Sequence, residues 1–352
     1  MKRRVLKWMG LAFLGLLLMV AALLAYVMAT ALDSEHPVGF QVTQTKRPDG
    51  KPIPIGVWYP TQARAWPTTL ASLQMKVADG APVAGQGLPL VLISHGNGAG
   101  LTAHADLAMA LASAGYVVAA PMHGGDNYAD QSAVGQPGWL GGRGQDLRSS
   151  LDHLLKQWPG HAHIDPARVG AYGFSAGGFT VLSVIGGQPD LRLIAQHCAA
   201  AADEFVCKLL AHSQSPLLKA DTPWMSEQFA VDPRIQAAVV AAPGLGFAFT
   251  PASLAQLKLP LQLWSGERDE VVPLASNGLA LQRALGGRLE VHSVPGAAHY
   301  AFLLPCSGLG KLLAPPMLCE DPAQFDRAAF HRDMNAKLRI FFDANLPKRV
   351  ST

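Results

Sequence analysis

Residues 173–177, with the sequence Gly-Phe-Ser-Ala-Gly, follow an apolar run and precede a stretch of small residues. This pattern is typical of a strand that turns sharply into a helix and presents Ser175 at the turn. Glycines two positions before and two after the serine leave room for the neighbouring backbone. A serine hydroxyl is a weak nucleophile by itself, so the motif predicts covalent chemistry only if a base lies within hydrogen-bond reach.

A base and a carboxylate that could orient it follow two later apolar runs. Asp269 comes just past the predicted strand 259–265, and His299 comes just past the predicted strand 289–294. Since parallel strands end at the same edge of a sheet, we expect both side chains to converge on the serine as a catalytic triad. Two further carboxylates in the same loop remain alternatives to Asp269: Glu267 and Glu270.

The negative charge that develops on a substrate carbonyl during attack needs preorganised donors. Residues 94–98, Ser-His-Gly-Asn-Gly, follow the first predicted parallel strand. We expect the oxyanion hole to consist of the backbone N–H groups of Asn97 and Ala176. His95 is expected to hold this loop by hydrogen bonds, with a role as a second base as the alternative. His123, at the tip of the next predicted strand, either lines the pocket or fixes its own loop.

Several aromatic side chains fall near the predicted active edge of the sheet and are candidate walls of an apolar pocket. Each has the alternative of an ordinary place in the core. They are Phe174, Phe179, Trp264, Tyr300 and Phe302.

The elements that must position these residues alternate between strand and helix from residue 88 onward. Such alternation predicts a mostly parallel sheet covered by helices on both faces. Two earlier runs, 38–45 and 53–59, read as an antiparallel hairpin around Pro48-Asp49-Gly50, and residues 66–84 read as a loop. The expected later elements are strands at 90–94, 116–120, 168–174, 235–242, 259–265 and 289–294, and helices at 102–114, 144–157, from 176, 275–285 and 325–344.

Two stretches do not fit the alternation, residues 188–233 and 305–322, and we expect insertions there. Each is expected either to overhang the active-site edge or to be a plain surface excursion. Each also holds two cysteines, and the short separations favour the disulfides Cys198–Cys207 and Cys306–Cys319, with buried free thiols as the alternative. Neither pair has the C-x-x-C spacing of a zinc site, so no metal is expected.

The first residues of the chain predict insertion into a membrane. Four basic residues precede Trp8, and no charge interrupts the 24 residues from Trp8 to Ala31. As a helix this run would reach about 36 Å, enough to cross a hydrocarbon core about 30 Å thick. The basic flank stays cytoplasmic, so the rest of the chain is expected to be exported. Residues 1–32 are thus a signal-anchor, or a signal peptide cleaved after Ala29-Thr30-Ala31.

The remaining chain, 37–352, is expected to be one catalytic domain with no second domain. Its charge argues against nucleic acid as a partner. The whole chain carries 28 basic and 25 acidic residues, and without the four leading positives the balance is 24 − 25 = −1. A near-neutral body has no electrostatic footprint for nucleic acid.

With the motifs at 94–98, 173–177, 266–273 and 296–299 in this order, the chain resembles the α/β-hydrolase superfamily. Within it, the chain looks like the dienelactone-hydrolase group related to the platelet-activating-factor acetylhydrolases. Dienelactone hydrolases proper carry a cysteine nucleophile, whereas this chain has Ser175, so lactone chemistry does not transfer. The resemblance implies a serine carboxylic-ester hydrolase that acts on a small-molecule ester without metal or organic cofactor. The alternatives are a peptidase or thioesterase on the same fold, or a non-catalytic binding protein.

Overall fold

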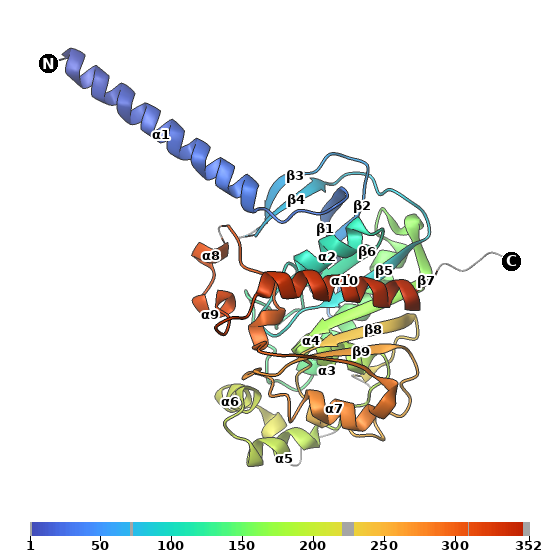
Figure 1. Ribbon diagram of the computed structural model, residues 1–352. Helices are drawn as coiled ribbons and strands as arrows, with labels where there is room; N and C mark the ends of the chain where they lie inside the picture. The colour runs from blue at the N-terminus through green and yellow to red at the C-terminus, as the bar shows by residue number, and fades with distance from the viewer. Residues whose placement is uncertain (1, 71–72, 220–228, 309, 348–352) are drawn as a thin grey trace.

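The computed structural model describes residues 2–70, 73–219, 229–308 and 310–347. Within these ranges ten strands form one sheet in the order β10-β9-β8-β7-β5-β6-β2-β1-β4-β3 (Figure 1). The strands are β1 (Val38–Lys46), β2 (Pro52–Pro60), β3 (Trp66–Leu70), β4 (Leu73–Asp79), β5 (Leu88–Ser94), β6 (Val117–Pro121), β7 (Ile164–Phe174), β8 (Ile235–Ala241), β9 (Leu261–Gly266) and β10 (Glu290–Val294).

The six strands from β5 to β10 pair in parallel, and β2 and β1 continue the sheet in antiparallel pairing beyond β6. Residues of β5 and β6 are buried throughout, which is why these strands read as unbroken apolar runs. The structure confirms the predicted fold, a mostly parallel α/β-hydrolase sheet that opens with antiparallel strands.

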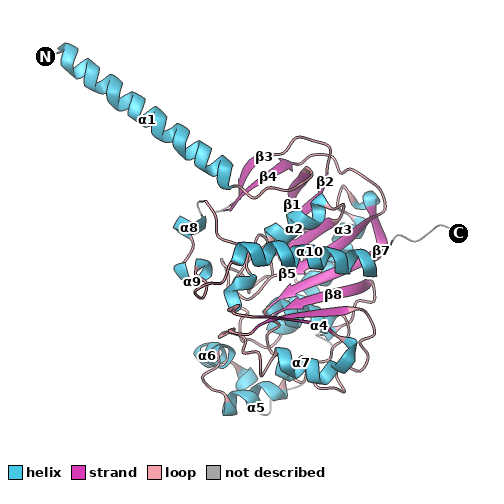
Figure 2. Cartoon of the chain, in the orientation of Figure 1, coloured by secondary structure: helices cyan, strands magenta, loops and turns pink. Residues whose placement is uncertain are grey.

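Helices cover both faces of the sheet (Figure 2). The core on one face includes buried side chains of α3 (Trp139–Lys156), α4 (Ala176–Val184) and α7 (Gly278–Leu285). The core on the other face includes those of α2 (Ala105–Ser113) and α10 (Arg327–Asn345). The sheet therefore lies between two separate apolar layers, and only its edges are free to carry polar loops.

The prediction of a loop over residues 66–84 is wrong for most of that stretch. β3 and β4 form an antiparallel pair, and β4 joins the sheet by a short parallel pairing of Ala78 and Asp79 with β1. Met75 and Val77 are buried against the α2 face. β3 and β4 pair locally with each other, whereas the pairing of Ala78 and Asp79 that joins them to the sheet is with residues of β1 more than thirty positions away, which the local sequence does not show.

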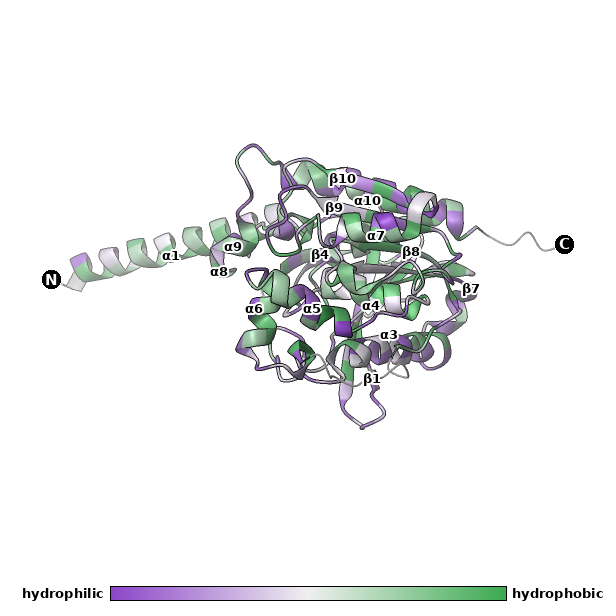
Figure 3. Ribbon diagram, turned by 90° about the horizontal axis from the view of Figure 1, so that it is seen from below, coloured by the Kyte–Doolittle hydropathy of each residue, from purple (hydrophilic) through white to green (hydrophobic). Residues whose placement is uncertain are grey.

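The N-terminal helix α1 (Lys2–Thr30) projects from the body and carries apolar side chains along its length (Figure 3). Its segment Arg4–Thr30 is long and apolar enough to cross a membrane, and none of its most apolar window is buried against the rest of the protein. The same length and composition would also suit a signal sequence.

Both predicted insertions carry short helices closed by a disulfide. The first holds α5 (Arg192–Ala200) and α6 (Phe205–His212), with Cys198 bonded to Cys207. The second holds α8 (Gly310–Leu313) and α9 (Pro316–Cys319), with Cys306 bonded to Cys319. Residues 220–228 of the first insertion lie outside the described residues.

Candidate active site

Ser175 sits at a strained turn between β7 and α4. Its backbone has φ 55° and ψ −120°, a left-handed conformation that is unfavourable for a residue with a side chain. The turn is held because the Ser175 N–H donates to the Ala241 carbonyl of β8 at 3.0 Å. A Cβ on Gly177 would overlap the carbonyl oxygen of Ser94, and one on Gly173 would overlap that of Gly177. These close approaches explain why both flanking positions are glycine.

The structure brings the three predicted triad residues into one hydrogen-bonded line. Nε2 of His299 lies 3.1 Å from Oγ of Ser175, and Nδ1 of His299 lies 2.8 Å from Oδ2 of Asp269. His299 is buried in a short 3-10 turn, and the ring of Phe174 packs on it at 4.8 Å between centroids. Such an imidazole can take the hydroxyl proton while the carboxylate holds its Nδ1–H tautomer.

Asp269, and neither rival acid, faces His299. Its second oxygen, Oδ1, accepts the backbone N–H groups of Val271 at 3.0 Å and Val272 at 2.6 Å. The side chain is 1% exposed. Glu267 instead accepts from the hydroxyl of Ser293 on the exposed edge strand β10. The loop after β9 therefore wraps its backbone around one carboxylate and leaves that group a single free oxygen for the histidine.

The two residues of the predicted oxyanion hole line the same cavity as Ser175. Asn97 and Ala176 both line it, and neither backbone N–H donates to an acceptor within the described part of the chain. Ala176 is the first residue of α4, so its amide also lies at the positive end of that helix. These two N–H groups therefore remain the candidate donors to an oxyanion beside Ser175.

A buried carboxylate below the first of these amides holds its loop. Oδ1 of Asp126 accepts the side-chain amide of Asn97 at 2.7 Å and the backbone N–H of Gly98 at 3.0 Å. Oδ2 accepts the indole N–H of Trp139 at 2.6 Å and Nη1 of Arg143 at 2.5 Å. Burial alone would raise the pKa of Asp126, but Arg143 and these hydrogen bonds lower it to about 2. Asp126 is thus an anion that four donors surround.

Arg143 ties this loop to the helix of the nucleophile. Its guanidinium is 1% exposed and donates to Asp126, to the His95 carbonyl and, from Nε at 3.0 Å, to the hydroxyl of Thr180 on α4. The loop that carries Asn97 and the helix that begins at Ala176 are therefore held by one rigid cation. The two N–H groups of the candidate oxyanion hole belong to these two elements.

His95 and His123 lie beneath the loop and do not line the cavity. Nδ1 of His95 donates to the Gly96 carbonyl at 2.7 Å, and Nε2 accepts the His123 backbone N–H at 3.1 Å. Nε2 of His123 lies 2.8 Å from the hydroxyl of Ser94. Burial lowers the pKa of His95 well below its usual range and that of His123 to about 4. Both rings are neutral at pH 7 and serve as fixed hydrogen-bonding groups.

We expect Asp126→Asn to lower kcat by about 10²-fold while leaving KM nearly unchanged, because Asn97 would lose its fixed position. An asparagine presents one amide NH₂ where the carboxylate accepted four donors, so either Asn97 or Arg143 faces a donor. The free energy of unfolding should also fall, by about 3–5 kcal/mol, because Arg143 is left as an unpaired buried charge.

Arg327→Met is the matched control for this prediction. That guanidinium is also buried, against Asp321 at 2.8 Å, but it contacts no residue of the candidate oxyanion loop. The control should lose thermal stability and retain kcat below its melting temperature. An equal drop of kcat in both variants would show that Asp126 serves stability alone.

The cavity beside Ser175 is small and mostly apolar, with a volume of about 50 Å³. On this measure one water molecule needs about 10–15 Å³, so the cavity holds a group of only a few heavy atoms. One wall comes from the first insertion and the rest from α3, α4 and the loops that follow β5, β8 and β9. The lining residues besides Ser175 are Asn97, Trp139, Leu140, Ala176, Phe179, Glu204, Phe205, Val206, Leu209, Gly244, Leu245, Val271, Val272 and Asn277.

The aromatic residues expected as pocket walls have varied positions. Phe179 lines the cavity. Phe174 and Phe302 are buried behind His299, with their ring centroids 6.2 Å apart. Tyr300 lies beside His299 and is half-buried. Trp264 belongs to the core between the sheet and α10, where its indole N–H donates to Gln262.

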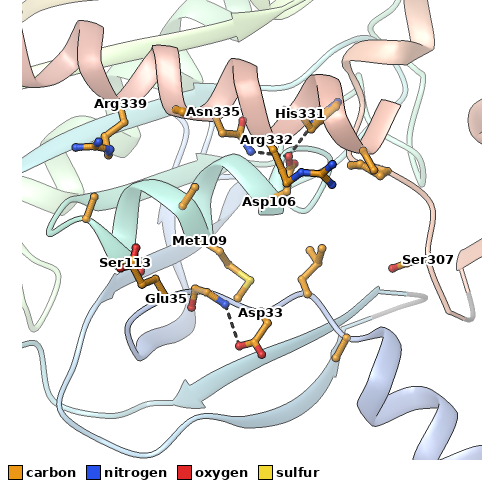
Figure 4. A pocket seen from close by; sticks show the side chains of 18 of the residues that line it. Asp33, Glu35, Asp106, Met109, Ser113, Ser307, His331, Arg332, Asn335 and Arg339 are labelled. Carbon is orange, nitrogen blue, oxygen red and sulfur yellow. Dashed lines mark hydrogen bonds and ion pairs between the residues drawn. The ribbon is translucent and has the colours of Figure 1, made fainter. Parts of the chain in front are cut away.

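A larger groove, of about 980 Å³, lies away from Ser175, between α2, α10 and residues 30–36 (Figure 4). At its wall Asp106 accepts from Nδ1 of His331 at 2.6 Å and from Asn335 at 2.9 Å. Nε2 of His331 contacts the Ala301 carbonyl at 2.9 Å, on the turn that begins with His299. The groove does not include the triad, but its wall supports the segment that carries His299.

The sequence did not single out Asp126, Arg143 or Trp139 as parts of the site. Arg143 lies one residue before the helix start expected at 144, whereas α3 begins at Trp139. A lone arginine at a helix end gives no local signal of a role. The one sequence feature that indicates a role for Arg143 is that this charged residue falls on the helix face that must pack on the sheet.

The hydrogen-bonded line of a strained serine, an imidazole and a buried carboxylate on a mostly parallel sheet defines a serine hydrolase of the α/β-hydrolase class. The sequence model of the prolyl oligopeptidase family matches residues 104–302, more than half of the chain. The chain belongs to this family. A second model, of platelet-activating factor acetylhydrolase isoform II, matches residues 55–136.

Known proteins of several activities are similar to this chain. Acylamino-acid-releasing enzyme 2 of Oryza sativa subsp. japonica is 27% identical over 226 residues, which are 60% of this chain and 27% of that protein. The chain therefore spans about a quarter of the length of this curated relative. A ferulic acid esterase from Streptomyces cinnamoneus has 19% identity and a TM-score of 0.60 over 91% of this chain and 95% of that chain. Dipeptidyl peptidase 4 of Porphyromonas gingivalis has 14% identity and a TM-score of 0.50 over 87% and 35%.

The two solved structures share the fold with this chain. Together with the family match, the geometry supports a serine acyl hydrolase.

Proposed function

We propose that this protein is a carboxylic-ester hydrolase that forms an acyl-enzyme on Ser175 and accepts esters with a small acyl group. The observation that carries the proposal is the hydrogen-bonded line of Ser175, His299 and Asp269, whose serine lines a cavity of about 50 Å³. A small apolar cavity beside the nucleophile suits a short acyl chain. The match to an acetylhydrolase model over residues 55–136, which include the Asn97 loop, supports the same substrate class.

The mechanism follows from the geometry. Nε2 of His299 takes the hydroxyl proton as Oγ of Ser175 attacks the ester carbonyl. The new oxyanion accepts hydrogen bonds from the N–H groups of Asn97 and Ala176. As the tetrahedral intermediate collapses, His299 returns the proton to the leaving alcohol. Water then enters, loses a proton to His299 and releases the acid by the same two steps. Asp269 stabilises the imidazolium in both halves.

Hydrolysis of p-nitrophenyl acetate, butyrate and octanoate by the full chain in detergent tests this proposal, with p-nitroanilides of amino acids and peptides and an acyl thioester as competing substrates. We expect the acetate and butyrate esters to give the highest kcat/KM. Faster turnover of the anilides would favour a peptidase, the second candidate that the prolyl oligopeptidase match supports. Binding of esters without turnover would indicate a non-catalytic binding protein.

The length of acyl chain that the cavity accepts should depend on α6, because side chains of α6 form one of its walls. Phe205→Ala removes a ring that lines it, and about two more methylene groups should then fit. At about 0.8 kcal/mol for each buried methylene, kcat/KM for the octanoate relative to the acetate should rise about tenfold. Leu279→Ala, at an exposed leucine of α7 outside the cavity, is the control and should leave the ratio unchanged. An unchanged ratio in Phe205→Ala would place the acyl chain elsewhere.

The location proposed for the enzyme is outside the cytoplasm, with α1 as its membrane anchor and its body facing the periplasm or the exterior. The apolar length of α1 and the two disulfides are compatible with this location. Cleavage behind Ala31 would instead release a soluble protein. Extraction of the membrane fraction with alkaline carbonate separates the two, since an anchored chain stays in the pellet with its N-terminal residues intact.

A further inference from the structure

The body of the protein is attached to α1 without a free linker. Immediately after the helix, the Leu32 N–H donates to the Gln74 carbonyl, and the Lys76 N–H donates to the Leu32 carbonyl, both at 2.8 Å. The ammonium of Lys76 also pairs with Asp33 at 2.5 Å. The chain therefore passes from the helix directly into pairing with β4. A membrane that holds α1 therefore also holds the body of the protein at a fixed distance from its surface.

The second insertion is seated on the last turn of the same helix. The hydroxyl of Tyr26 donates to the Gly308 carbonyl at 3.3 Å, and the hydroxyl of Ser307 donates to the Thr30 carbonyl at 3.1 Å. Gly308 has φ 53°, and a Cβ there would lie 2.5 Å from the hydroxyl of Thr30. The contact is close enough to fix the height of the disulfide loop 306–319 along α1.

The depth of α1 in a bilayer follows from its charges. Lys7 is the last charged residue before the apolar run, and about 20 helical residues cross a hydrocarbon core of about 30 Å. With Lys7 at the inner boundary, the outer boundary falls near residue 28. This position lies between Tyr26 and Thr30, the two residues that contact the loop. The loop is therefore level with the outer boundary of the bilayer.

The disulfide loop 306–319 has the composition expected of a segment at the outer boundary of the bilayer. Between Cys306 and Cys319 there is one lysine and no acidic residue. Leu313 on α8 is 67% exposed, and Met317 on α9 is 58% exposed. These short helices lie beside the end of α1 (Figure 1). Large apolar side chains that project into water from a loop closed by a disulfide indicate an interaction surface.

We propose that the loop 306–319, with its exposed side chains Leu313 and Met317, inserts into the outer interface of the bilayer. This proposal rests on the proposed role of α1 as a retained anchor. The apolar side chains would enter the headgroup region while Lys311 remains at the level of the phosphates. The body would then have one fixed orientation on the membrane.

A fluorophore that reports its surroundings tests the contact on the full chain in lipid vesicles. The four native cysteines are all in disulfides, so Leu313→Cys introduces the single free thiol. Leu279→Cys is the matched control, an exposed leucine on α7 at the end of the body far from α1 (Figure 1). Met317→Cys gives a second reading from the neighbouring helix. Each thiol is labelled with a nitrobenzoxadiazole group.

In vesicles, we expect a lipid with a nitroxide near its headgroup to quench the label at 313 at least about twofold more than the label at 279, and iodide in the water to quench it less. Equal quenching at both sites, with the chain retained after carbonate extraction, would overturn the surface contact and leave the anchor intact. Release of the chain by carbonate would overturn both. Protection at 313 that grows with the protein-to-lipid ratio would assign the surface to a second copy of the chain, against the proposal.

Discussion

Ser175→Ala should lower kcat for p-nitrophenyl acetate by about 10⁵-fold or more, with the fold retained. The hydroxyl lies 3.1 Å from Nε2 of His299 and is the group that this imidazole can activate. Alanine keeps the backbone turn, because the left-handed conformation is imposed by hydrogen bonds of the main chain. The residual rate should come from the oxyanion donors and from binding. Stopped-flow kinetics and labelling with a fluorophosphonate probe both measure the loss.

Ser183→Ala is the matched control for this loss. Ser183 lies two helical turns further along α4, is also buried, and donates its hydroxyl to the Phe179 carbonyl at 2.9 Å. It should keep kcat within about threefold, since an internal hydrogen bond of this kind contributes about 1 kcal/mol to stability and does not contact the substrate. Turnover by Ser175→Ala at the rate of the control would remove the acyl-enzyme from the mechanism.

The triad geometry could be predicted because each member is placed by a local pattern. Ser175 and Asp269 each follow an apolar run that forms a buried parallel strand, and His299 follows the exposed parallel edge strand β10. Parallel strands end at one edge of a sheet. Sequence order then decides which loops meet. The structure adds the choice among neighbouring acids, which depends on which carboxylate the backbone of Val271 and Val272 surrounds.

The sequence does not show which face of a doubly buried strand a side chain occupies. In β9, Leu263 packs on the α4 side and Trp264 on the α10 side. Both neighbours are apolar, so no alternation of polar and apolar residues distinguishes the two faces. This is why Trp264 could be placed near the active edge from the sequence and lies in the core in the structure.

The sequence also does not show that Asp126 and Arg143 hold the oxyanion loop in place, for a different reason. Asp126 and Arg143 are 17 positions apart, in a loop and a helix, and their pairing depends on how α3 packs beside α4. Short-range motifs describe the donors that meet the substrate. The buried ion pair that fixes those donors is a product of tertiary packing, like the pairing of Ala78 and Asp79 with β1 that joins β4 to the sheet.

Asp269→Asn should lower kcat by about 10⁴-fold with little change in KM, because it reverses the polarity of His299. The side chain of residue 269 receives two backbone N–H donors at one oxygen, from Val271 and Val272. An asparagine must keep its carbonyl oxygen there and so turn its NH₂ toward Nδ1 of His299. Nδ1 then becomes an acceptor, the ring proton moves to Nε2, and Nε2 points an N–H at Ser175 instead of a lone pair. Steady-state kinetics at pH 7 measure the loss.

Glu270→Gln and Glu267→Gln are the controls that make this prediction specific. Both are carboxylates of the same loop, and Glu267 bonds to Ser293 at the surface, so their loss should change kcat less than about threefold. A larger drop in Glu270→Gln than in Asp269→Asn would assign the orienting acid to the neighbouring residue. The nitrogen NMR shifts of His299 give an independent reading, since the proton should reside on Nδ1 in the native protein and on Nε2 in Asp269→Asn.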